Sequence, residues 1–307
     1  MPLYRGDVLI KELRKARNLT QEQLCEGICE KGTLSRIERG LRRPDWFTFE
    51  RLMQRLGEDP IKYYTDIVNI EDKQIIDLKE KIHKCLLMKT EEGFKEAETF
   101  LIQLEQRGAN NLVRQYALYV KASLASHRGQ HNKSLSLAVR GIRVTVPHFD
   151  EDKIDTYILS MDEVRLINII AIAYAELSFN EKSLEIQKKL IASMDKSYHD
   201  EDEKLKFYVT LLYNTANDLF KLKQYDRCMS MCDKGIRLCD ADGFNYTYLP
   251  MFLYYKSLCL YRINNIDEGN THVYRAILLF KGMERYAELD MITKYLEKEF
   301  GITLPVI

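Results

Sequence analysis

The sequence predicts an all-α protein, on the basis of three observations. In segment after segment, apolar residues recur at intervals of three and four, the spacing that places them on one face of a helix. The 307 residues include only six prolines and fourteen glycines, so few positions interrupt regular structure. A phrase that marks a turn between two helices also recurs five times after residue 90. Together these features predict a small helical domain followed by a series of helix pairs.

The segment Thr20–Gly40 has the pattern of two short helices joined by a tight turn. Thr20 and Gln23 form a capping box, in which the threonine hydroxyl accepts from the Gln23 amide and the glutamine side chain bonds back to the cap. A helix is therefore expected to begin directly after Thr20, with Leu24 and Ile28 on its apolar face. The turn falls at residues 30–32.

The second helix of this pair is predicted to have one apolar and one basic face. Leu34, Ile37 and Leu41 recur at i, i+3 and i+7, so all three are expected to face the interior. Residues 31–43 hold five basic side chains against one acid, in a chain whose 46 basic and 46 acidic residues give no net charge. Such a local excess of positive charge is typical of a surface that binds nucleic acid.

We interpret the second helix as the reader of a DNA major groove, because long donors reach base edges and phosphates. The candidate DNA contacts are Thr20, Gln21, Lys31, Thr33, Ser35, Arg36, Arg39, Arg42 and Arg43. Glu38 would repel phosphate, so we expect it to turn inward and pair with Arg14. The pattern resembles the XRE/Cro type of helix-turn-helix domain. Gln21 and the run Ser35–Gly40 of this chain match that family's pattern. The alternative is a surface helix pair with solvated arginines.

Further helices complete a compact domain predicted to span residues 1–66, with five helices in total. One covers residues 7–17, with Asn18 as its left-handed stop. Another begins after Pro44 and Asp45, where the proline breaks the chain and the aspartate caps the helix. It carries Trp46, the single tryptophan, which we expect in the core.

The connector from Ile61 to Leu78 is apolar at helical spacing and lacks a glycine- or serine-rich linker. A helix is expected here, and such a connector transmits orientation where a flexible tether would not. A two-fold DNA site accepts only recognition helices about one DNA turn apart. We therefore expect the connector to pass a change in the rest of the chain on to the DNA-binding domain.

Five turn-and-helix-start phrases follow one another in residues 67–307, the second predicted domain. They begin at Phe94, His131, Phe179, Tyr225 and Ile266, at intervals of 37, 48, 46 and 41 residues. Each follows one helical stretch and opens another, which is the pattern of a helix-hairpin repeat. The series resembles a degenerate tetratricopeptide array, which implies a right-handed superhelix. A last helix over Glu284–Phe300 is expected to cap it.

The first helix of each repeat offers one residue at an equivalent position, eleven residues before the turn. These residues are His83, Val120, Asn168, Asn214 and Tyr255. Asn168 and Asn214 have apolar neighbours in sequence, where an amide needs a partner. Because an asparagine side chain both donates and accepts, two of them one repeat apart can hold the backbone of an extended peptide. The alternative is a hydrogen bond to a neighbouring helix, and Tyr174, Tyr254 and Tyr255 are candidate pocket walls or core residues.

A helix-turn-helix domain joined by a helix to five degenerate repeats resembles the RRNPP superfamily of Gram-positive quorum-sensing regulators, most closely its PlcR branch. The residues that carry this resemblance lie in Leu24–Cys29, Ser35–Glu38 and Tyr213–Ala216. It implies a cytoplasmic homodimer that binds a palindromic DNA operator and a re-imported signalling peptide. The peptide-binding candidates that it implies are Asn168, Asn214, Asn217, Tyr255, Lys84 and Lys89, with Lys84 or Lys89 receiving the acidic end of the peptide.

Other kinds of site are not favoured by the sequence. The seven cysteines are odd in number and dispersed, and no signal peptide is evident, which favours a reducing compartment. Cys228, Cys232 and Cys239 share one helix face but have no histidine or fourth cysteine nearby, so packing is preferred to a metal site. No phosphate loop, nucleophile elbow or pair of catalytic carboxylates occurs, so neither an enzyme nor a cofactor is expected. The longest apolar run, Leu166–Ala175, is too short to cross a membrane.

One rival interpretation remains open from the sequence. The repeats would bind a protein partner as an adaptor, as in Rap-type members of the same superfamily, and the helix-turn-helix would serve mainly for assembly. Salt-dependent binding of duplex DNA separates the two interpretations, because a domain that has lost its DNA function would show none.

Overall fold

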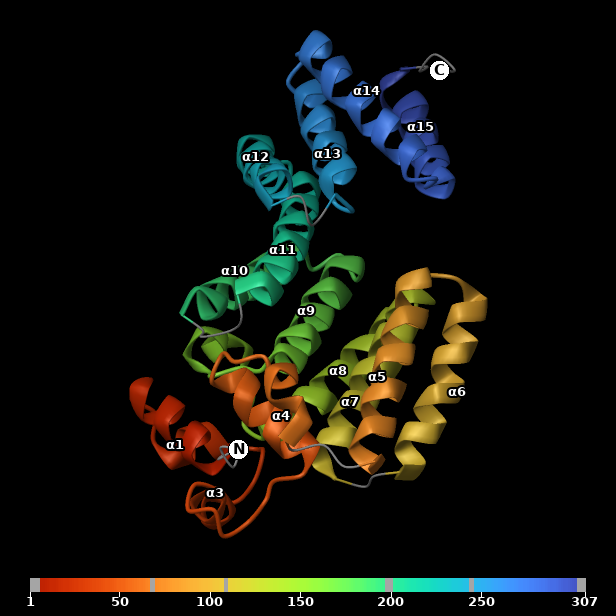
Figure 1. Ribbon diagram of the computed structural model, residues 1–307. Helices are drawn as coiled ribbons and strands as arrows, with labels where there is room; N and C mark the ends of the chain where they lie inside the picture. The colour runs from red at the N-terminus through yellow and green to blue at the C-terminus, as the bar shows by residue number, and fades with distance from the viewer. Residues whose placement is uncertain (1–5, 67–69, 108–109, 197–200, 243–245, 303–307) are drawn as a thin grey trace. The chain divides into compact units, whose positions relative to one another are not determined.

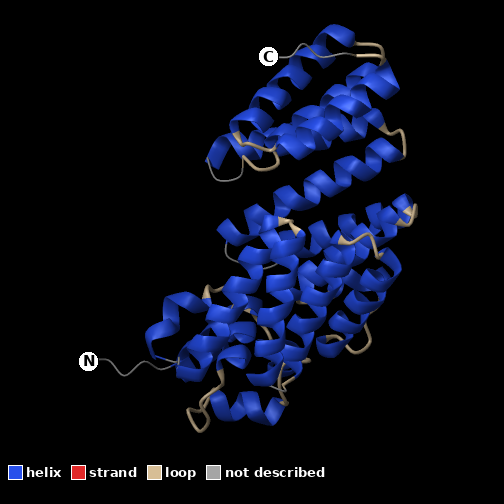
Figure 2. Ribbon diagram, turned by 90° about the vertical axis from the view of Figure 1, so that its right-hand side faces the viewer, coloured by secondary structure: helices blue, strands red, loops and turns tan. Residues whose placement is uncertain are grey.

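The computed structural model describes residues 6–66, 70–107, 110–196, 201–242 and 246–302. Within these ranges the regular structure is helical and no strand occurs, so the predicted all-α class is confirmed (Figure 2). The chain forms two compact units, residues 1–204 and 205–307, which are described separately. The predicted functional division after residue 66 stays a prediction.

Unit 1 begins with the predicted helix-turn-helix domain. Its elements are α1 (Gly6–Ala16), α2 (Gln21–Cys25), α3 (Lys31–Ile37), α4 (Trp46–Arg55) and the 3-10 helix η1 (Pro60–Asp66). The Thr20 capping box is present, and Asp45 caps α4 by accepting from the Thr48 amide. Asn18 has the predicted left-handed backbone, with φ of 54°. The fifth helix of the domain is therefore a 3-10 helix.

The core of this domain is formed by side chains from all four α-helices. Ile10, Leu24, Leu34, Ile37 and Trp46 are at most 1% exposed, as the apolar patterns predicted. Leu41 contradicts its prediction, because 63% of it is exposed to solvent. The reason is that α3 ends at Ile37 and the chain turns through Gly40, whose φ is 68°, so the helical spacing no longer applies.

The remaining helices of unit 1 form three successive pairs (Figure 1). They are α5 (Ile70–Met88) with α6 (Glu91–Arg107), α7 (Asn111–His127) with α8 (His131–Thr145), and α9 (Met161–Glu176) with α10 (Asn180–Lys196). The 3-10 helix η2 (Glu151–Thr156) lies between the second and third pairs in the chain. α6 begins three residues before the predicted Phe94, because Glu91 and Glu92 fill its first turn, where carboxylates are favourable.

Two more pairs and the capping helix follow, all in unit 2 except the first four residues of α11, which belong to unit 1. They are α11 (Glu201–Lys221) with α12 (Tyr225–Asp242), α13 (Leu249–Arg262) with α14 (Ile266–Gly282), and α15 (Tyr286–Phe300). The five predicted helix pairs and the final helix are thus confirmed. The handedness of the array stays a prediction.

The connector differs from the single helix predicted from Ile61 to Leu78. Residues 60–66 form η1, residues 67–69 lie outside the described part, and α5 starts only at Ile70. Ile61 is 65% exposed, so it adds nothing to a buried helix face. Helical spacing cannot distinguish a 3-10 turn followed by a new helix from one continuous helix, because the apolar positions differ little over so few residues.

The first repeats pack directly against the helix-turn-helix domain. Figure 1 shows α4 beside α7 and α9 in unit 1. Phe47, on α4, belongs to the same hydrophobic cluster as Ile82 on α5 and Val113 and Tyr116 on α7. Phe47 therefore continues the core of the first repeats into the DNA-binding domain.

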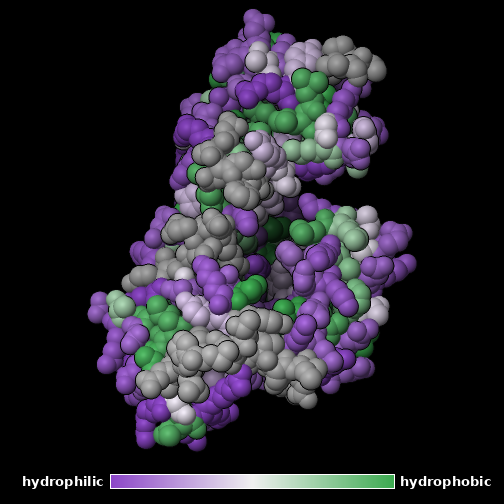
Figure 3. Space-filling view, in the orientation of Figure 1, coloured by the Kyte–Doolittle hydropathy of each residue, from purple (hydrophilic) through white to green (hydrophobic). Residues whose placement is uncertain are grey.

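The surface is mainly hydrophilic with separate hydrophobic patches on the face in Figure 3. Exposed apolar side chains are spread over several helices, with Leu87, Ile102 and Met291 each more than half exposed. Across the described residues, no helix combines the length and hydrophobicity that crossing a membrane requires.

Candidate functional site

The predicted DNA-reading helix presents its basic side to solvent. Leu34 and Ile37 point into the core, and Lys31, Arg36 and Arg39 are exposed. Arg42 and Arg43 follow in an exposed turn, and Thr33 and Ser35 are half-buried. Most of the predicted DNA contacts therefore lie on one short helix and the turn after it, which gives a compact basic surface.

The same helix is fixed to the domain by Glu38, as predicted. The Glu38 carboxylate accepts from Arg14 Nε at 2.6 Å and from Arg14 Nη2 at 2.9 Å, a bidentate pair. Arg14 also donates to the carbonyl of Leu19 at 2.7 Å. Burial alone would raise the pKa of Glu38, but the bonds from Arg14 and Gln21 outweigh it and hold the pKa below its ordinary value. The carboxylate is therefore charged and bound within the domain.

Gln21 lies in a different setting from the other predicted contacts. Its side-chain amide donates to Glu38 Oε2 at 2.8 Å, so it braces the end of α3. Lys31 is paired with the exposed Glu22 at 2.6 Å, which partly offsets its charge. Sequence reasoning missed the role of Glu22, although its place in the first turn of α2 was visible. Thr20 is exposed and serves as the cap of α2, and contact of these residues with DNA stays a prediction.

The two asparagines lie on the first helices of successive repeats, as the register predicted. Asn168, on α9, is 7% exposed and lies next to the fully buried Ile167 and about one turn from the fully buried Ala171. Asn214, on α11, is half-buried. Each of the two makes an interaction within the chain. Their predicted role toward a peptide stays a prediction.

Asn217 and Tyr255 are brought together in unit 2. The Tyr255 hydroxyl donates to Asn217 Oδ1 at 2.8 Å. The Tyr255 ring lies against Tyr213, with ring centres 5.9 Å apart, and against Phe220 at the same distance. Burial raises the pKa of Tyr255 far above its ordinary value, so its hydroxyl stays protonated and donates. The pair forms a polar position at the edge of an aromatic cluster.

The two predicted lysines lie at the surface near the end of α5. Lys84 is 66% exposed and pairs with Glu80 on the same helix at 2.7 Å. Lys89 follows the helix in a left-handed conformation, with φ of 51°. Neither side chain is buried, so both are accessible to a charged ligand.

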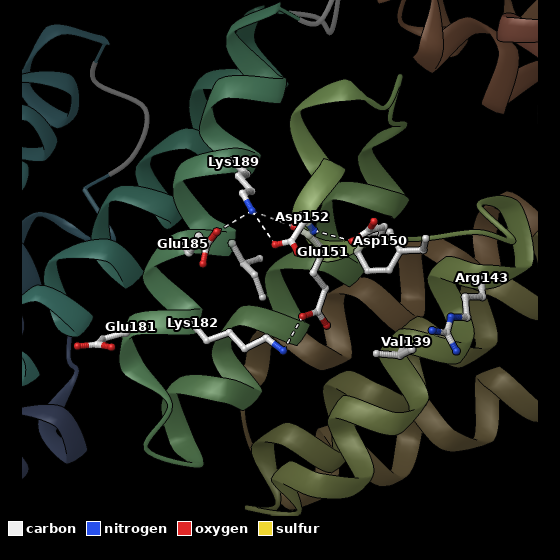
Figure 4. A pocket seen from close by; sticks show the side chains of 11 residues that line it. Val139, Arg143, Asp150, Glu151, Asp152, Glu181, Lys182, Glu185 and Lys189 are labelled. Atoms are coloured by element: carbon white, nitrogen blue, oxygen red, sulfur yellow. Dashed lines mark hydrogen bonds and ion pairs between the residues drawn. The ribbon is translucent and has the colours of Figure 1, made fainter.

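A pocket of about 660 Å³ lies among α8, η2 and α10 of unit 1 (Figure 4). None of the predicted DNA- or peptide-binding residues lines it, but the candidate wall residue Tyr174 lies beside it, donating to Glu151 at 3.1 Å and accepting from Lys182 at 2.8 Å. Figure 4 shows Lys182 directed at Glu151, and Lys189 between Asp152 and Glu185. These nitrogen-to-oxygen distances are 2.8, 3.1 and 2.7 Å respectively. The signal in the sequence was the acidic run 150–152, but its lysine partners come 30 or more residues later and no spacing rule connects them.

The cysteines behave as apolar core residues. Cys228, Cys232 and Cys239 are fully buried, and the Cys228 sulfur donates to the carbonyl of Ala216 at 3.2 Å. Among the described residues, no group of histidine, cysteine and acidic side chains is arranged to hold a metal ion. The expected packing of these three cysteines is confirmed.

The fold and the basic surface define the chain as a helix-turn-helix protein with a helical-repeat domain. In sequence, residues 8–61 match a helix-turn-helix domain family, and residues 148–296 match the RNPP family C-terminal domain. Residues 148–296 are therefore an RNPP family domain that follows a helix-turn-helix domain in the chain, in agreement with the RRNPP resemblance found in the sequence. This pair of domains is that of a peptide-regulated, DNA-binding transcription regulator. No curated protein matches the chain at a significant level.

Several solved structures are similar in fold. PlcR of Bacillus thuringiensis in complex with the peptide PapR7 and DNA aligns over 94% of this chain and 98% of its own, with a TM-score of 0.61 and 19% identity. Its apo form aligns over the same shares, with a TM-score of 0.60 and 16% identity. The apo form of the competence regulator ComR from Streptococcus vestibularis covers 90% of this chain and 92% of its own, with a TM-score of 0.51 and 15% identity.

Proposed function

We propose that the protein is a homodimeric transcription regulator that reads a palindromic operator with α3 and answers to a short signalling peptide bound by its repeats. The observation that carries the proposal is the exposed basic face of α3, fixed by the buried Glu38–Arg14 pair and followed in the chain by an RNPP family domain. We place its action in the cytoplasm, where genomic DNA is accessible to it.

The DNA-binding part of the proposal follows from how the charges are arranged. The negative charge of Glu38 is compensated by Arg14 inside the domain, and the arginines of α3 and the next turn point outward. Arg36 lies near the middle of this surface, where a guanidinium can donate to a guanine edge. Arg42 and Arg43 lie beyond the helix, where phosphates are the expected partners. Residues of both kinds are needed for sequence-specific binding.

The peptide part follows from amides held in apolar helices. A buried asparagine such as Asn168 has donors and acceptors that match a peptide backbone, and the exposed Lys84 can meet a carboxylate. The PlcR structure similar to this one contains a peptide and DNA together. A short peptide that is apolar in the middle and acidic at one end fits this set of residues.

The experiment measures DNA binding by the full chain with fluorescence anisotropy. A duplex is first selected from a randomised pool by the full chain, and affinity is then measured over a range of salt concentrations. We expect nanomolar-range binding that falls steeply with salt. Arg36→Ala should weaken the selected duplex, and Arg140→Ala, an exposed arginine of α8, is the matched control that should not. Absence of salt-dependent binding would refute the DNA role and favour the adaptor interpretation.

The peptide is sought with a displayed library of random heptapeptides. Selected peptides should bind the full chain and change its affinity for the selected duplex. The oligomeric state is measured by sedimentation with and without the duplex, with a dimer expected. Peptides that bind without changing DNA affinity would refute regulation through the repeats.

A further inference from the structure

Two buried arginines lie on the side of α4 that faces the repeats. Arg51 is 2% exposed and Arg55 is 3% exposed. Arginine is rarely buried without a charged partner. Because these two are buried, they are not part of the DNA-binding surface, and their burial must have another role. Both side chains belong to the helix-turn-helix domain, yet neither is directed at solvent.

Their partners are carboxylates in the first turn of α9, more than 100 residues later in the chain. Arg51 Nη2 lies 2.8 Å from Asp162 Oδ2, and Arg51 Nη1 donates to the Ser160 hydroxyl. Arg55 Nη2 lies 3.0 Å from Glu163 Oε1. Two buried cations thus meet two buried carboxylates, and the charges cancel.

The carboxylates are held in place from within the repeats. Glu163 Oε2 accepts from the backbone amide of Ser160 at 2.6 Å, which closes the capping box of α9, and Glu163 Oε1 accepts from the Thr145 hydroxyl. Asp162 accepts from Arg165 at 3.0 Å. Burial by itself would raise the pKa of Asp162, but the charge of Arg51 outweighs it, so the pKa is lowered and the group is charged.

Arg55 continues the connection to the helix before the recognition helix. Its Nη1 donates to the carbonyl of Glu26 at 2.6 Å and to that of Leu24 at 3.2 Å. The turn after α2 also touches the repeats, since a Cβ added at Gly27 would lie 1.8 Å from the carbonyl oxygen of Thr145. The repeats therefore contact the helix-turn-helix motif itself as well as its supporting helix.

A second contact lies beside the first. The Lys79 ammonium, from α5, lies 2.8 and 2.9 Å from the two carboxylate oxygens of Glu50 on α4. It also lies over the Phe47 and Tyr116 rings, 5.6 and 4.9 Å from their centres. Together the two contacts fix α4 in both position and rotation on the repeats.

α9 is the helix that also carries Asn168. From Asp162 to Asn168 the helix is unbroken, and at 1.5 Å per residue the two positions are about 9 Å apart along its axis. Backbone hydrogen bonds join these positions along one continuous helix, so a displacement at Asn168 is passed to the first turn. Any ligand that shifts Asn168 therefore shifts the two carboxylates as well.

We propose that the first turn of α9 is the anchor that holds the DNA-binding domain on the repeats and the route by which a ligand bound at Asn168 moves the recognition helix. Arg51, Arg55, Asp162 and Glu163 are positioning residues in this anchor. The connector between the domains is not required for transmission, because the anchor reaches α2 through Arg55. The part that concerns a bound ligand rests on the proposed function, whereas the anchor itself does not.

The anchor is tested in the full chain with Asp162→Asn/Glu163→Gln, which removes both carboxylate charges and leaves the helix-turn-helix sequence untouched. The matched control is Glu91→Gln/Glu98→Gln, which removes the two carboxylates paired with Arg128 inside the repeats. Rotational correlation times of backbone amides are measured by NMR relaxation, separately for α1–α4 and for α5–α10. In the wild type and the control, the two sets should agree.

In the anchor variant, the amides of α1–α4 should tumble faster than those of α5–α10, with the helical circular dichroism retained. Equal tumbling of the two sets in the folded variant would overturn the anchor. If the double variant loses its helical signal, Asp162→Asn alone is used, since it keeps the Arg55–Glu163 pair. Equal tumbling in that variant, with no faster hydrogen exchange in α4 than in the wild type, would likewise overturn the anchor.

The route is tested by hydrogen exchange with the duplex selected by the full chain. If α3 and α9 are coupled, DNA bound to α3 must change how readily the backbone hydrogen bonds of α9 open. Duplex binding should change the exchange rate of amides in residues 164–168 by about threefold or more in the wild type, and not in the anchor variant. A wild type that binds the duplex with no change in α9 would overturn the route. A wild type that binds no duplex would instead refute the proposed function and leave the tumbling result standing.

Discussion

Replacing Glu38 with glutamine should destabilise the helix-turn-helix domain while leaving its shape almost unchanged. The carboxylate is 5% exposed and accepts three hydrogen bonds, two from Arg14 and one from Gln21, at 2.6 to 2.9 Å. Glutamine fills the same space and removes the charge. Arg14 would then keep only the Leu19 carbonyl as a strong partner.

The magnitude follows from the burial of the pair. Removing one partner of a buried ion pair costs about 3–5 kcal/mol. Two features reduce this cost, because the Arg14 side chain is 12% exposed and glutamine keeps one carbonyl acceptor. We therefore expect a loss of about 2–3 kcal/mol, which corresponds to a roughly 30- to 150-fold change in an equilibrium constant.

The assay is native-state hydrogen exchange of the full chain. Amides in α1–α4 should exchange faster in Glu38→Gln by that factor, since they report the opening of this domain. Amides of unit 2 should be unaffected. The control is Glu22→Gln, made at the carboxylate that pairs with Lys31 at the surface, where both side chains are more than half exposed. That pair should contribute less than about 1 kcal/mol.

The effect should also depend on pH in a defined direction. The pKa of Glu38 is lowered in the folded chain, so its contribution is full above the ordinary value of 4.5 and is lost as the pH falls through the folded pKa. The difference between the wild type and Glu38→Gln should therefore shrink below pH 4.5. Equal losses in Glu38→Gln and Glu22→Gln, or a difference that persists at low pH, would refute the assigned role of the buried pair.

Three further predictions concern binding. Arg36→Ala should lose about 1–3 kcal/mol on the selected duplex and little on random DNA, measured by anisotropy; equal losses on both would move Arg36 to the phosphate contacts. Arg42→Ala/Arg43→Ala should weaken all duplexes alike and reduce the slope of log affinity against log salt by about 1.8, and an unchanged slope would remove both residues from the surface. Asn214→Ala should weaken a library-selected peptide by about 1–3 kcal/mol in calorimetry because a buried hydrogen bond is lost, whereas undiminished affinity would exclude Asn214 from the peptide site.

The features that followed from the sequence are those set by local spacing. The Thr20 capping box involves residues three apart, and the five helix pairs follow a repeated phrase whose apolar positions recur every three or four residues. The Glu38–Arg14 pair was predictable for another reason, since a carboxylate on a DNA-reading surface is unfavourable unless it turns inward. In each case the chemistry of a few residues, a cap, an apolar stripe or a carboxylate near phosphate, is enough to predict the local structure.

The errors arose where local spacing stopped applying. Leu41 fits the apolar stripe of α3, but the helix ends at Ile37 and the side chain is exposed. The connector fits a helical period, but η1 and α5 divide it. The DNA contact of Gln21 is not among these errors and stays a prediction, and its bond to Glu38 shows that the side chain also supports α3. Short segments carry too few periods to distinguish an ending helix from a continuing one.

What the sequence alone determined is the class of the protein: helices, their caps, the basic surface and the repeat that follows it. Only the tertiary structure decided which charges are buried. Arg51 and Arg55 look in the sequence like solvated side chains of α4, and Asp162 and Glu163 look like the ordinary acidic first turn of α9. They meet because α4 packs against the repeats, more than 100 residues away in the chain. The free energy of such a contact depends on desolvation of both partners, and desolvation is a property of the packed structure that no spacing of residues encodes.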